Sequence, residues 1–377
     1  MMLENFNMKT ELENTSQDNE KSPLPAAWGR LMKLAVCENC DWQFIYQGGQ
    51  PLLFCPHCYR KSLVDLSQET GQQIDFYEPE LILPLGFQSA QIQQIFQTFA
   101  EGNWFPPTDL SLKNLVGRST LLFLPIWLVD STVKATWKAE AGFNYQVLSH
   151  QDRFDDNRGG WSSQEVTETR IRWEARVGQL KRIYQNHTSP ALNEHSALML
   201  KVGSFDLASA NPYDRMALPE KGWSACLPNR STIDSWSDAR LGFQASAGNE
   251  CKQACQADAL RNFAWEPEFS DQKWTLLLVP VFSTFYTDDE GKPQALLVNG
   301  QSGKLWGVKR ASIQRARKTS LLLLAAAAGI FLLSLLFSLV AVIFPPILVI
   351  GVIGFVLSLL VGLSALVPFV VVWKTNQ

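Results

Sequence analysis

Four cysteines near the N-terminus have the types and spacing of a metal site. They form two CxxC pairs, Cys37 with Cys40 and Cys55 with Cys58, and fourteen residues separate the pairs. Each pair places two sulfurs on one tight turn, and two such turns can bring four thiolates onto one tetrahedral ion. Four protein ligands leave no position for water, so the expected metal is structural and holds together a segment too small to fold alone.

The ligand set narrows the identity of the ion. Four thiolates favour zinc, and we expect one structural zinc ion per chain. A rubredoxin-like iron site has the same ligands, and a thioredoxin-type redox pair would need a CxxC at a helix N-terminus. Both are less favoured, the redox pair because residues 42–46 and 52–54 have the pattern of strands around a Gly-Gly turn. His57 lies inside the second pair, and we expect a bystander because four thiolates already fill the tetrahedral shell.

No other group of residues has the pattern of an active site. Cys251 and Cys255 lie four apart on a predicted helix, and Cys226 is the only other thiol. We expect all three to be small, buried apolar side chains. The chain has no Walker lysine loop, no GxSxG elbow and no HExxH motif. We therefore predict no catalytic residue, no cofactor-binding residue, no small-molecule substrate and no enzymatic activity.

Two sets of polar residues in the middle of the chain were natural candidates for an ion or a proton. The acidic set comprises Asp152, Asp155 and Asp156. It precedes Gly159 and Gly160 and misses the EF-hand spacing, which predicts a solvated turn. The histidine set comprises His150, His187 and His195. These histidines have no paired nucleophile or carboxylate, which predicts surface residues.

The elements that must position these residues follow from apolar periodicity. The expected fold class is α+β: a small four-cysteine zinc ribbon over residues 30–64, a mixed, mainly antiparallel α+β domain over residues 76–308, and a C-terminal two-helix transmembrane hairpin. Within the domain, helical patterns cover residues 90–100 and 249–263. Strand patterns cover residues 121–129, 132–139, 166–175 and 274–282, with a hairpin through residues 296–300. Leu124-Pro125 and Val279-Pro280 look alike, which suggests an internal duplication.

The C-terminus has the composition of a membrane hairpin. Residues 321–373 contain no charged residue, and as one helix they would far exceed a hydrocarbon core of about 30 Å. Pro345 and Pro346 divide the run into predicted spans over residues 321–344 and 347–373. A basic run precedes the first span and Lys374 follows the second, which places both chain ends in the cytoplasm by the positive-inside rule.

The charge and the cysteine content of the chain indicate which partners and which cellular compartment are expected. The formal net charge is −3, and eight Lys or Arg follow the last acidic residue, Glu290, so by subtraction the first 290 residues carry −11. This acidic balance disfavours nucleic acid as the main partner. We expect residues 1–25 to form a disordered tail, and they contain no apolar run that would indicate a signal peptide. Seven cysteines, an odd number, fit a reducing compartment.

The order of several motifs resembles a known family. After the cysteine pairs come LPIWLVD at residues 124–130, RIRW at residues 170–173, and LVNGQSG at residues 297–303 with Gly307. Together they resemble an uncharacterised bacterial family of membrane-anchored, TFIIB-type zinc-ribbon proteins, often labelled as relatives of the primosomal helicase protein N'. The resemblance implies the bacterial inner (plasma) membrane. The helicase label has no support here, because the chain lacks a nucleotide-binding loop.

The function expected from these features is that of a membrane-anchored, cytosol-facing adaptor or scaffold. Its partners would be the lipid bilayer and a protein at the cytosolic membrane face, and the resemblance implies a membrane-stress or flotillin-like assembly. The alternative is a zinc-ribbon nucleic-acid-binding protein tethered to the membrane. That alternative needs a basic face, for which the ribbon supplies only Arg30, Lys33, Arg60 and Lys61.

Overall fold

The structure is a computed structural model, and it describes most of the chain. The described residues are 28, 32–47, 52–66, 77–155, 159–215, 218, 222–341 and 343–377. The predicted tail over residues 1–25, the turn at residues 48–49, Arg30 and Asp156 lie outside this part. What is described is an α+β fold, which confirms the predicted class.

A single mixed sheet joins the strands. They are β1 Met32–Cys37, β2 Gln43–Gln47, β3 Leu63–Asp65, β4 Leu81–Ile82, β5 Thr120–Asp155, β6 Gly160–Pro190, β7 Asn211–Pro212, β8 Trp223–Cys226, β9 Ala259–Thr287, β10 Pro293–Asn299 and β11 Leu305–Gly307. The main path is β11-β10-β9-β5-β8-β2-β1-β3. Among the described strands, the parallel pairings are β4 with β9 and β5 with β8, so the sheet is mainly antiparallel as predicted.

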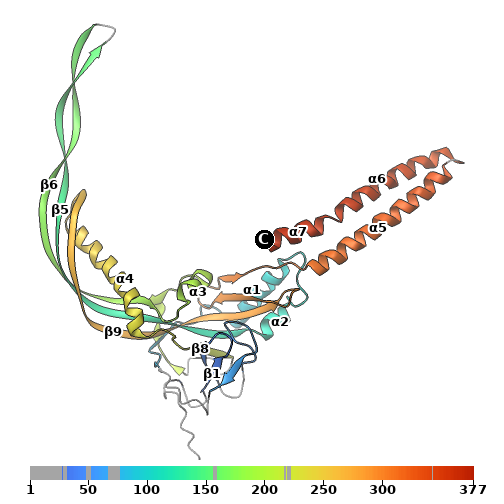
Figure 1. The fold of residues 1–377 in the computed structure, drawn as a ribbon, viewed down its shortest axis with the longest axis horizontal. Helices are drawn as coiled ribbons and strands as arrows, with labels where there is room; N and C mark the ends of the chain where they lie inside the picture. The colour runs from blue at the N-terminus through green and yellow to red at the C-terminus, as the bar shows by residue number, and fades with distance from the viewer. Residues whose placement is uncertain are drawn as a thin grey trace, which may run out of the picture.

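Helices cover parts of this sheet and extend from it. They are α1 Ser89–Glu101, α2 Leu112–Gly117, α3 His195–Val202, α4 Thr232–Gln253, α5 Ile313–Val340, α6 Leu348–Ser364 and α7 Val367–Asn376, with short 3-10 turns η2 Leu207–Ser209 and η4 Pro345–Ile347. The amphipathic pattern over residues 90–100 correctly predicts α1, which packs Phe96 and Phe99 against Tyr286 and Leu296. This core lies beside the sheet next to the C-terminal hairpin (Figure 1).

Three very long strands form a curved arm that leaves the body of the molecule (Figure 1). The predicted strands over residues 121–129 and 132–139 are parts of β5, which continues for 36 residues. β5 pairs with β6 on one side and with β9 on the other. Beyond Gly142, where the pairing with β9 ends, β5 and β6 continue as a two-stranded ribbon. The predicted loop at Asp152 and Asp155 is therefore wrong, because both residues are paired within this ribbon.

The helix predicted over residues 249–263 is wrong in its bounds. Helix α4 begins at Thr232 and ends at Gln253, and Gln256 adopts a left-handed conformation just beyond it. Residues from Ala259 onward belong to β9, since their backbone pairs with Gly142 and its neighbours in β5. Pairing with β5, which is distant in the sequence, therefore decides the conformation of these residues. Helical periodicity alone could not indicate this pairing.

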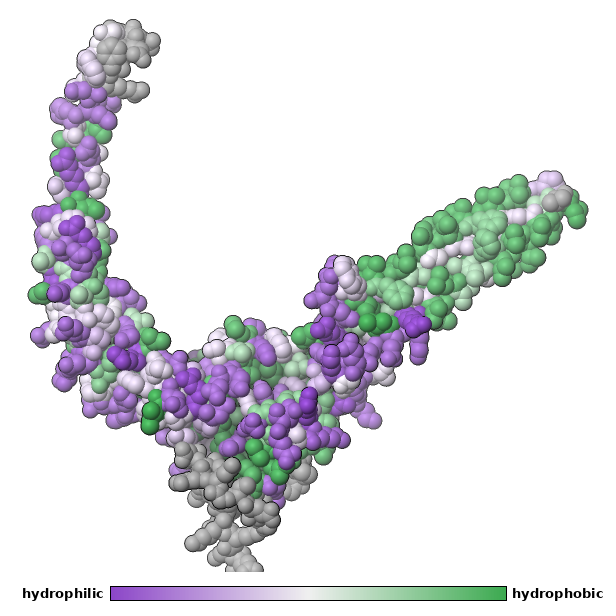
Figure 2. All heavy atoms as spheres, in the orientation of Figure 1, coloured by the Kyte–Doolittle hydropathy of each residue, from purple (hydrophilic) through white to green (hydrophobic). Residues whose placement is uncertain are grey.

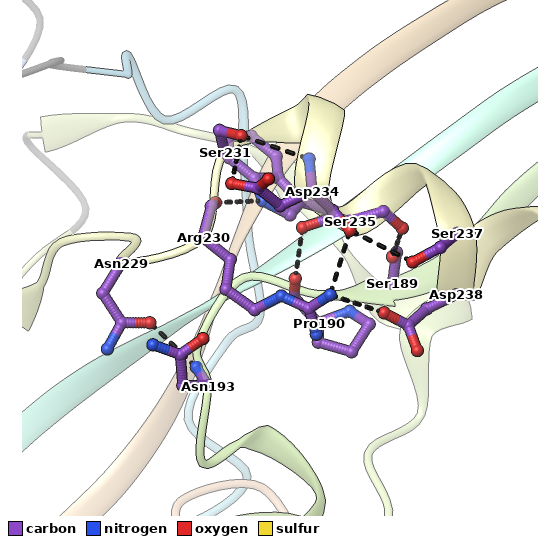
Figure 3. Close-up of polar contacts among 11 residues, drawn as sticks. Ser189, Pro190, Asn193, Asn229, Arg230, Ser231, Asp234, Ser235, Ser237 and Asp238 are labelled. Carbon is purple, nitrogen blue, oxygen red and sulfur yellow. Dashed lines mark hydrogen bonds and ion pairs between the residues drawn. The ribbon is translucent and has the colours of Figure 1, made fainter.

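Helix α4 is fixed to the end of β6 by polar contacts (Figure 3). Ser231 caps the helix, because its hydroxyl oxygen accepts a hydrogen bond of 3.2 Å from Asp234 N. Ser189 Oγ donates to the Ser235 carbonyl oxygen, and Ser235 Oγ donates to the Pro190 carbonyl oxygen, each at 2.7 Å. The helix therefore lies against the arm in one defined position.

The C-terminal helices form an apolar hairpin, as predicted. Both segments, Ile313–Val340 and Pro345–Asn376, are long and apolar enough to cross a membrane, and only 11% of each apolar window is buried. Figure 2 shows hydrophobic side chains along this hairpin. A Cβ on Gly351 would lie 2.4 Å from Ser338 Oγ, so glycine permits the close approach of α5 and α6. Pro368 stands near the start of α7, just after the break that separates it from α6.

A network of hydrogen bonds ties this hairpin to the sheet. Ser312 caps α5, and its Oγ also donates to Asp289 Oδ2 at 2.8 Å, from the turn between β9 and β10. The Tyr286 hydroxyl donates to the Val308 carbonyl oxygen and accepts from Arg310 N, both at 2.8 Å. We call the segment at residues 308–312 with these partners the junction. It links the apolar hairpin directly to the end of β9.

Candidate metal centre

The two cysteine turns have the same backbone geometry. In the first, Cys37 N donates to Trp42 O at 2.9 Å and Asp41 N donates to Cys37 O at 2.8 Å. In the second, Cys55 N donates to Arg60 O at 2.9 Å and Tyr59 N donates to Cys55 O at 2.9 Å. The fifth residue of each turn adopts a positive φ, 57° at Asp41 and 62° at Tyr59. The two turns are thus copies of one sulfur-presenting loop.

The four sulfurs converge. Cys37 Sγ lies 3.5 Å from Cys58 Sγ, and Cys40 Sγ lies 3.7 Å from Cys55 Sγ. All four sulfurs lie within 4.8 Å of one another. A tetrahedral ion with metal–sulfur bonds of about 2.3 Å requires sulfur–sulfur distances of about 3.8 Å. The four cysteines brought together by the fold can therefore bind a metal ion with little adjustment.

The electrostatics of the cluster require a cation for full ionisation. Burial raises the pKa of Cys40 to about 12, and it raises the pKa of Cys55 further. Burial also raises the pKa of Cys37, but hydrogen bonds, led by that with Ser62, bring the pKa down to about 7. Nearby thiolates repel each other in a buried space, so four charges are stable only beside a positive ion.

Hydrogen-bond donors surround the sulfurs. His57 N and Cys58 N donate to Cys55 Sγ at 3.4 and 3.5 Å. The Ser62 hydroxyl lies 2.9 Å from Cys37 Sγ. Such contacts orient metal ligands and stabilise the thiolate form. Ser62 was not among the predicted site residues, although its position four residues after Cys58 places it close to the cluster.

His57 contributes its backbone to the cluster while its ring packs elsewhere. The imidazole lies flat on the Trp42 indole, with ring centroids 3.8 Å apart and an interplanar angle of 3°. Burial lowers the pKa of His57, so the ring is neutral near pH 7. This stack packs the second cysteine turn, which contains His57, against Trp42, the residue just before β2.

The four-cysteine module, residues 32–47 and 52–66, is part of the large sheet. β2 pairs with β8, with Phe44 opposite Cys226. On the other side, Ser283 Oγ of β9 donates to the Pro56 carbonyl oxygen at 2.7 Å, and Tyr59 OH lies 3.2 Å from Ser283 Oγ. The module is therefore docked on the domain that follows it, a relationship that the sequence left open.

The remaining cysteines lie apart from the cluster of four sulfurs. Cys226 is buried in β8, and burial raises its pKa well above the usual value. Cys251 and Cys255 are buried together against Trp137 and Ala139 of the arm. These positions agree with the expectation of small, buried apolar side chains.

The predicted surface histidines divide into two kinds. His150 is exposed on the arm. His187 packs its ring edge on Phe243, with centroids 4.4 Å apart, and His195 is half-buried in α3. Burial lowers the pKa of both His187 and His195, so the expectation of a surface position is wrong for these two. Neither lies in the cysteine cluster.

Comparison of the chain with protein-family models, with curated proteins and with solved structures finds no match. The class of the site therefore rests on its own geometry: a closed set of four thiols in two identical turns, docked on a sheet that ends in an apolar helical hairpin.

Proposed function

We propose that this protein is a membrane-anchored adaptor whose zinc-stabilised module presents a protein-binding surface at the cytosolic face of the bacterial inner membrane. The observation that supports this most directly is the chain of fixed contacts from the cysteine turns through β9 to the apolar hairpin. A closed ligand set leaves no open position for chemistry, so the metal would shape a surface and not react.

Zinc is the ion we assign to the four cysteines. Metal analysis of the purified full-length protein should give one zinc per chain, and Cys55→Ser should remove most of it. Cys251→Ser is the matched control, because Cys251 is equally buried but lies outside the cluster. Iron at the same ratio, with the visible absorbance of an iron–thiolate site, would replace the zinc assignment.

The membrane arrangement we propose has both helical segments spanning the bilayer and both chain ends in the cytoplasm. Lys309, Arg310, Arg315, Arg317 and Lys318 surround the start of α5. The turn at Pro345 and Pro346 carries no charge. This asymmetry is typical of a hairpin inserted from the cytoplasmic side.

The partner we propose is a protein, in keeping with the resemblance to zinc-ribbon proteins thought to work in membrane-stress or flotillin-like assemblies. Leu53 of the module is 71% exposed between the half-buried Leu52 and Phe54, so its apolar side chain is open to contact with another protein. The zinc turns would hold this segment in a fixed shape.

A crosslinking pull-down from native membranes tests the adaptor role. Cys37→Ser with Cys40→Ser should lose the partner while the chain remains in the membrane, and Cys251→Ser with Cys255→Ser should retain it. Leu53→Asp changes the exposed surface without touching the sulfurs, and it should also lose the partner. Unchanged partner recovery with both the cluster variant and Leu53→Asp would contradict the role of the module.

The alternative, a tethered nucleic-acid-binding protein, is less favoured by the contacts of the module. Lys33 forms an ion pair of 3.1 Å with Asp65, and Arg60 donates a hydrogen bond of 2.7 Å to Asn39. Lys61 lies over the Phe54 ring. Salt-sensitive binding of an oligonucleotide by the full-length protein would revive this alternative.

A further inference from the structure

The outer edge of β6 is a long, regular strand edge without a neighbour in the described part of the chain. β6 pairs with β5 alone in the sheet. Its register is continuous from Tyr184, opposite Ser131, to Gly160, opposite Asp155. Half of the backbone N–H and C=O groups on such an edge point outward without a strand partner. In Figure 1 the two-stranded end of the arm, formed by β5 and β6, extends past α4 and β9 with no other described helix or strand beside it.

The strand at the opposite edge of the arm, β9, contains a proline and two irregularities. In β9, Pro267 lacks a backbone donor. Asn262 and Asp271 have positive φ values of 53° and 54°, close to two register shifts in the pairing with β5. Prolines and bulges are devices that protect free edges. The β6 edge between Gly160 and Tyr184 contains no proline and no register shift. Of the two edges of the arm, only the β9 edge therefore has these features.

The charged residues on one face of β6 are ordered so that two antiparallel copies of the strand would place opposite charges side by side. Alternate residues point to one face of the strand: Glu168, Arg170, Arg172, Glu174 and Arg176. The signs around the central arginine read Glu, Arg, Arg, Glu, Arg. When a second β6 lies antiparallel with its own central arginine opposite the first, every flanking acid meets a base.

We propose that the protein associates with a second copy of itself through the outer edges of β6, antiparallel, with a two-fold axis at Arg172. Glu168 of each copy then faces Arg176 of the second copy, and Arg170 faces Glu174. On the other face Ile171 meets Trp173. Arg172 meets its equivalent, but each Arg172 already has an ion pair of 3.0 Å with Glu174 of its own strand.

Neighbouring registers are less favourable. An axis at Ile171 would place Glu168 opposite Glu174, with like charges in contact. An axis at Trp173 would place Arg170 opposite Arg176. An axis at Ala175 would place Glu174 opposite Arg176 and Glu168 opposite Arg182, but Arg170 would lie opposite Leu180 without an acidic partner in the second copy. Register is strongly specified when a shift creates such conflicts.

Charge reversal on the full-length protein in detergent or nanodiscs tests this pairing. Light scattering should show a dimer for the wild type. Arg170→Glu alone and Glu174→Arg alone should each weaken dimerisation about tenfold or more, because like charges then oppose each other. The double variant should regain the dimer, and so should an equal mixture of the two single variants. A monomeric wild type, or single variants that dimerise as well as the wild type, would overturn the proposal.

Disulfide trapping tests the position of the axis. Arg172→Cys places two thiols opposite each other with Cα atoms about 5 Å apart, within the range of a disulfide. Glu168→Cys is the matched control on the same face, because its two copies would lie roughly 27 Å apart, eight residues along the strands. Mild oxidation should crosslink Arg172→Cys and not Glu168→Cys or the wild type. Equal crosslinking at both positions would contradict the two-fold axis at Arg172.

Discussion

Ser283 Oγ donates a hydrogen bond of 2.7 Å to the carbonyl oxygen of Pro56, and the two residues are 227 positions apart in the chain. Pro56 belongs to the second cysteine turn, and Ser283 belongs to the part of β9 that leads toward the apolar hairpin. Ser283 is 2% exposed. Through this contact the candidate metal centre and the junction share one strand, and the shape of each can depend on the other.

Removal of this hydroxyl should loosen the module. Ser283→Ala leaves the Pro56 carbonyl oxygen buried without its donor, which should cost about 1–3 kcal/mol of stability. We expect a lower melting temperature and faster transfer of the metal to a chelator. Ser163→Ala, at an exposed position on the arm, is the control. A metal-transfer rate in Ser283→Ala equal to that of the wild type would contradict the coupling.

The packing of His187 predicts a pH dependence of stability. Burial lowers the pKa of His187 below its unfolded value of about 6.5. The unfolded chain therefore binds the proton more strongly, so the stabilising contribution of the neutral ring is complete above about pH 6.5 and is lost as the pH falls toward the folded pKa. His187→Phe should flatten this loss in urea titrations between pH 7 and pH 5.

The exposed His150 provides the comparison for that experiment. His150→Phe should leave the difference in stability between pH 7 and pH 5 as it is in the wild type. If the free energy of unfolding of His187→Phe falls between pH 7 and pH 5 as much as that of the wild type, the neutral imidazole beside Phe243 is not the cause of this pH dependence.

The junction should depend on the Tyr286 hydroxyl. Tyr286→Phe keeps the ring but removes a donor to Val308 and an acceptor for Arg310 N. We expect a loss of about 1 kcal/mol in local stability, since two partly buried backbone groups lose their partner. Amide hydrogen exchange at Arg310 should accelerate accordingly. Tyr145→Phe on the arm should leave that exchange unaltered, and an equally slow Arg310 amide in both variants would refute the role of the hydroxyl.

Local patterns in the sequence predicted the cysteine cluster and the apolar hairpin, because each is encoded within a short segment. CxxC spacing places two sulfurs on a turn, and a run of apolar residues broken by Pro345 and Pro346 specifies two helices. The docking of the cysteine turns on Ser283 had no local signal, because it depends on residues far apart in the chain.

The arm could not be predicted from local patterns either. Leu124 lies opposite Val279 in the antiparallel pairing of β5 and β9, so the two look-alike proline segments are direct neighbours in the sheet. Each long strand is continuous because the others pair with it over its length. For the same reason residues 259–263 are a strand despite their helical pattern. Pairing between distant segments outweighs local propensity here.

The measurement that most directly tests the central claim, a body anchored at the cytosolic face by a membrane hairpin, is cysteine accessibility in intact cells. A membrane-impermeant maleimide should label Ile343→Cys, at the 83% exposed position beside the Pro-Pro turn, from outside the inner membrane. Gln377→Cys, at the last residue, should react only after the membrane is permeabilised. Labelling of Gln377→Cys in intact cells, or protection of Ile343→Cys before and after permeabilisation, would contradict a hairpin with both ends in the cytoplasm.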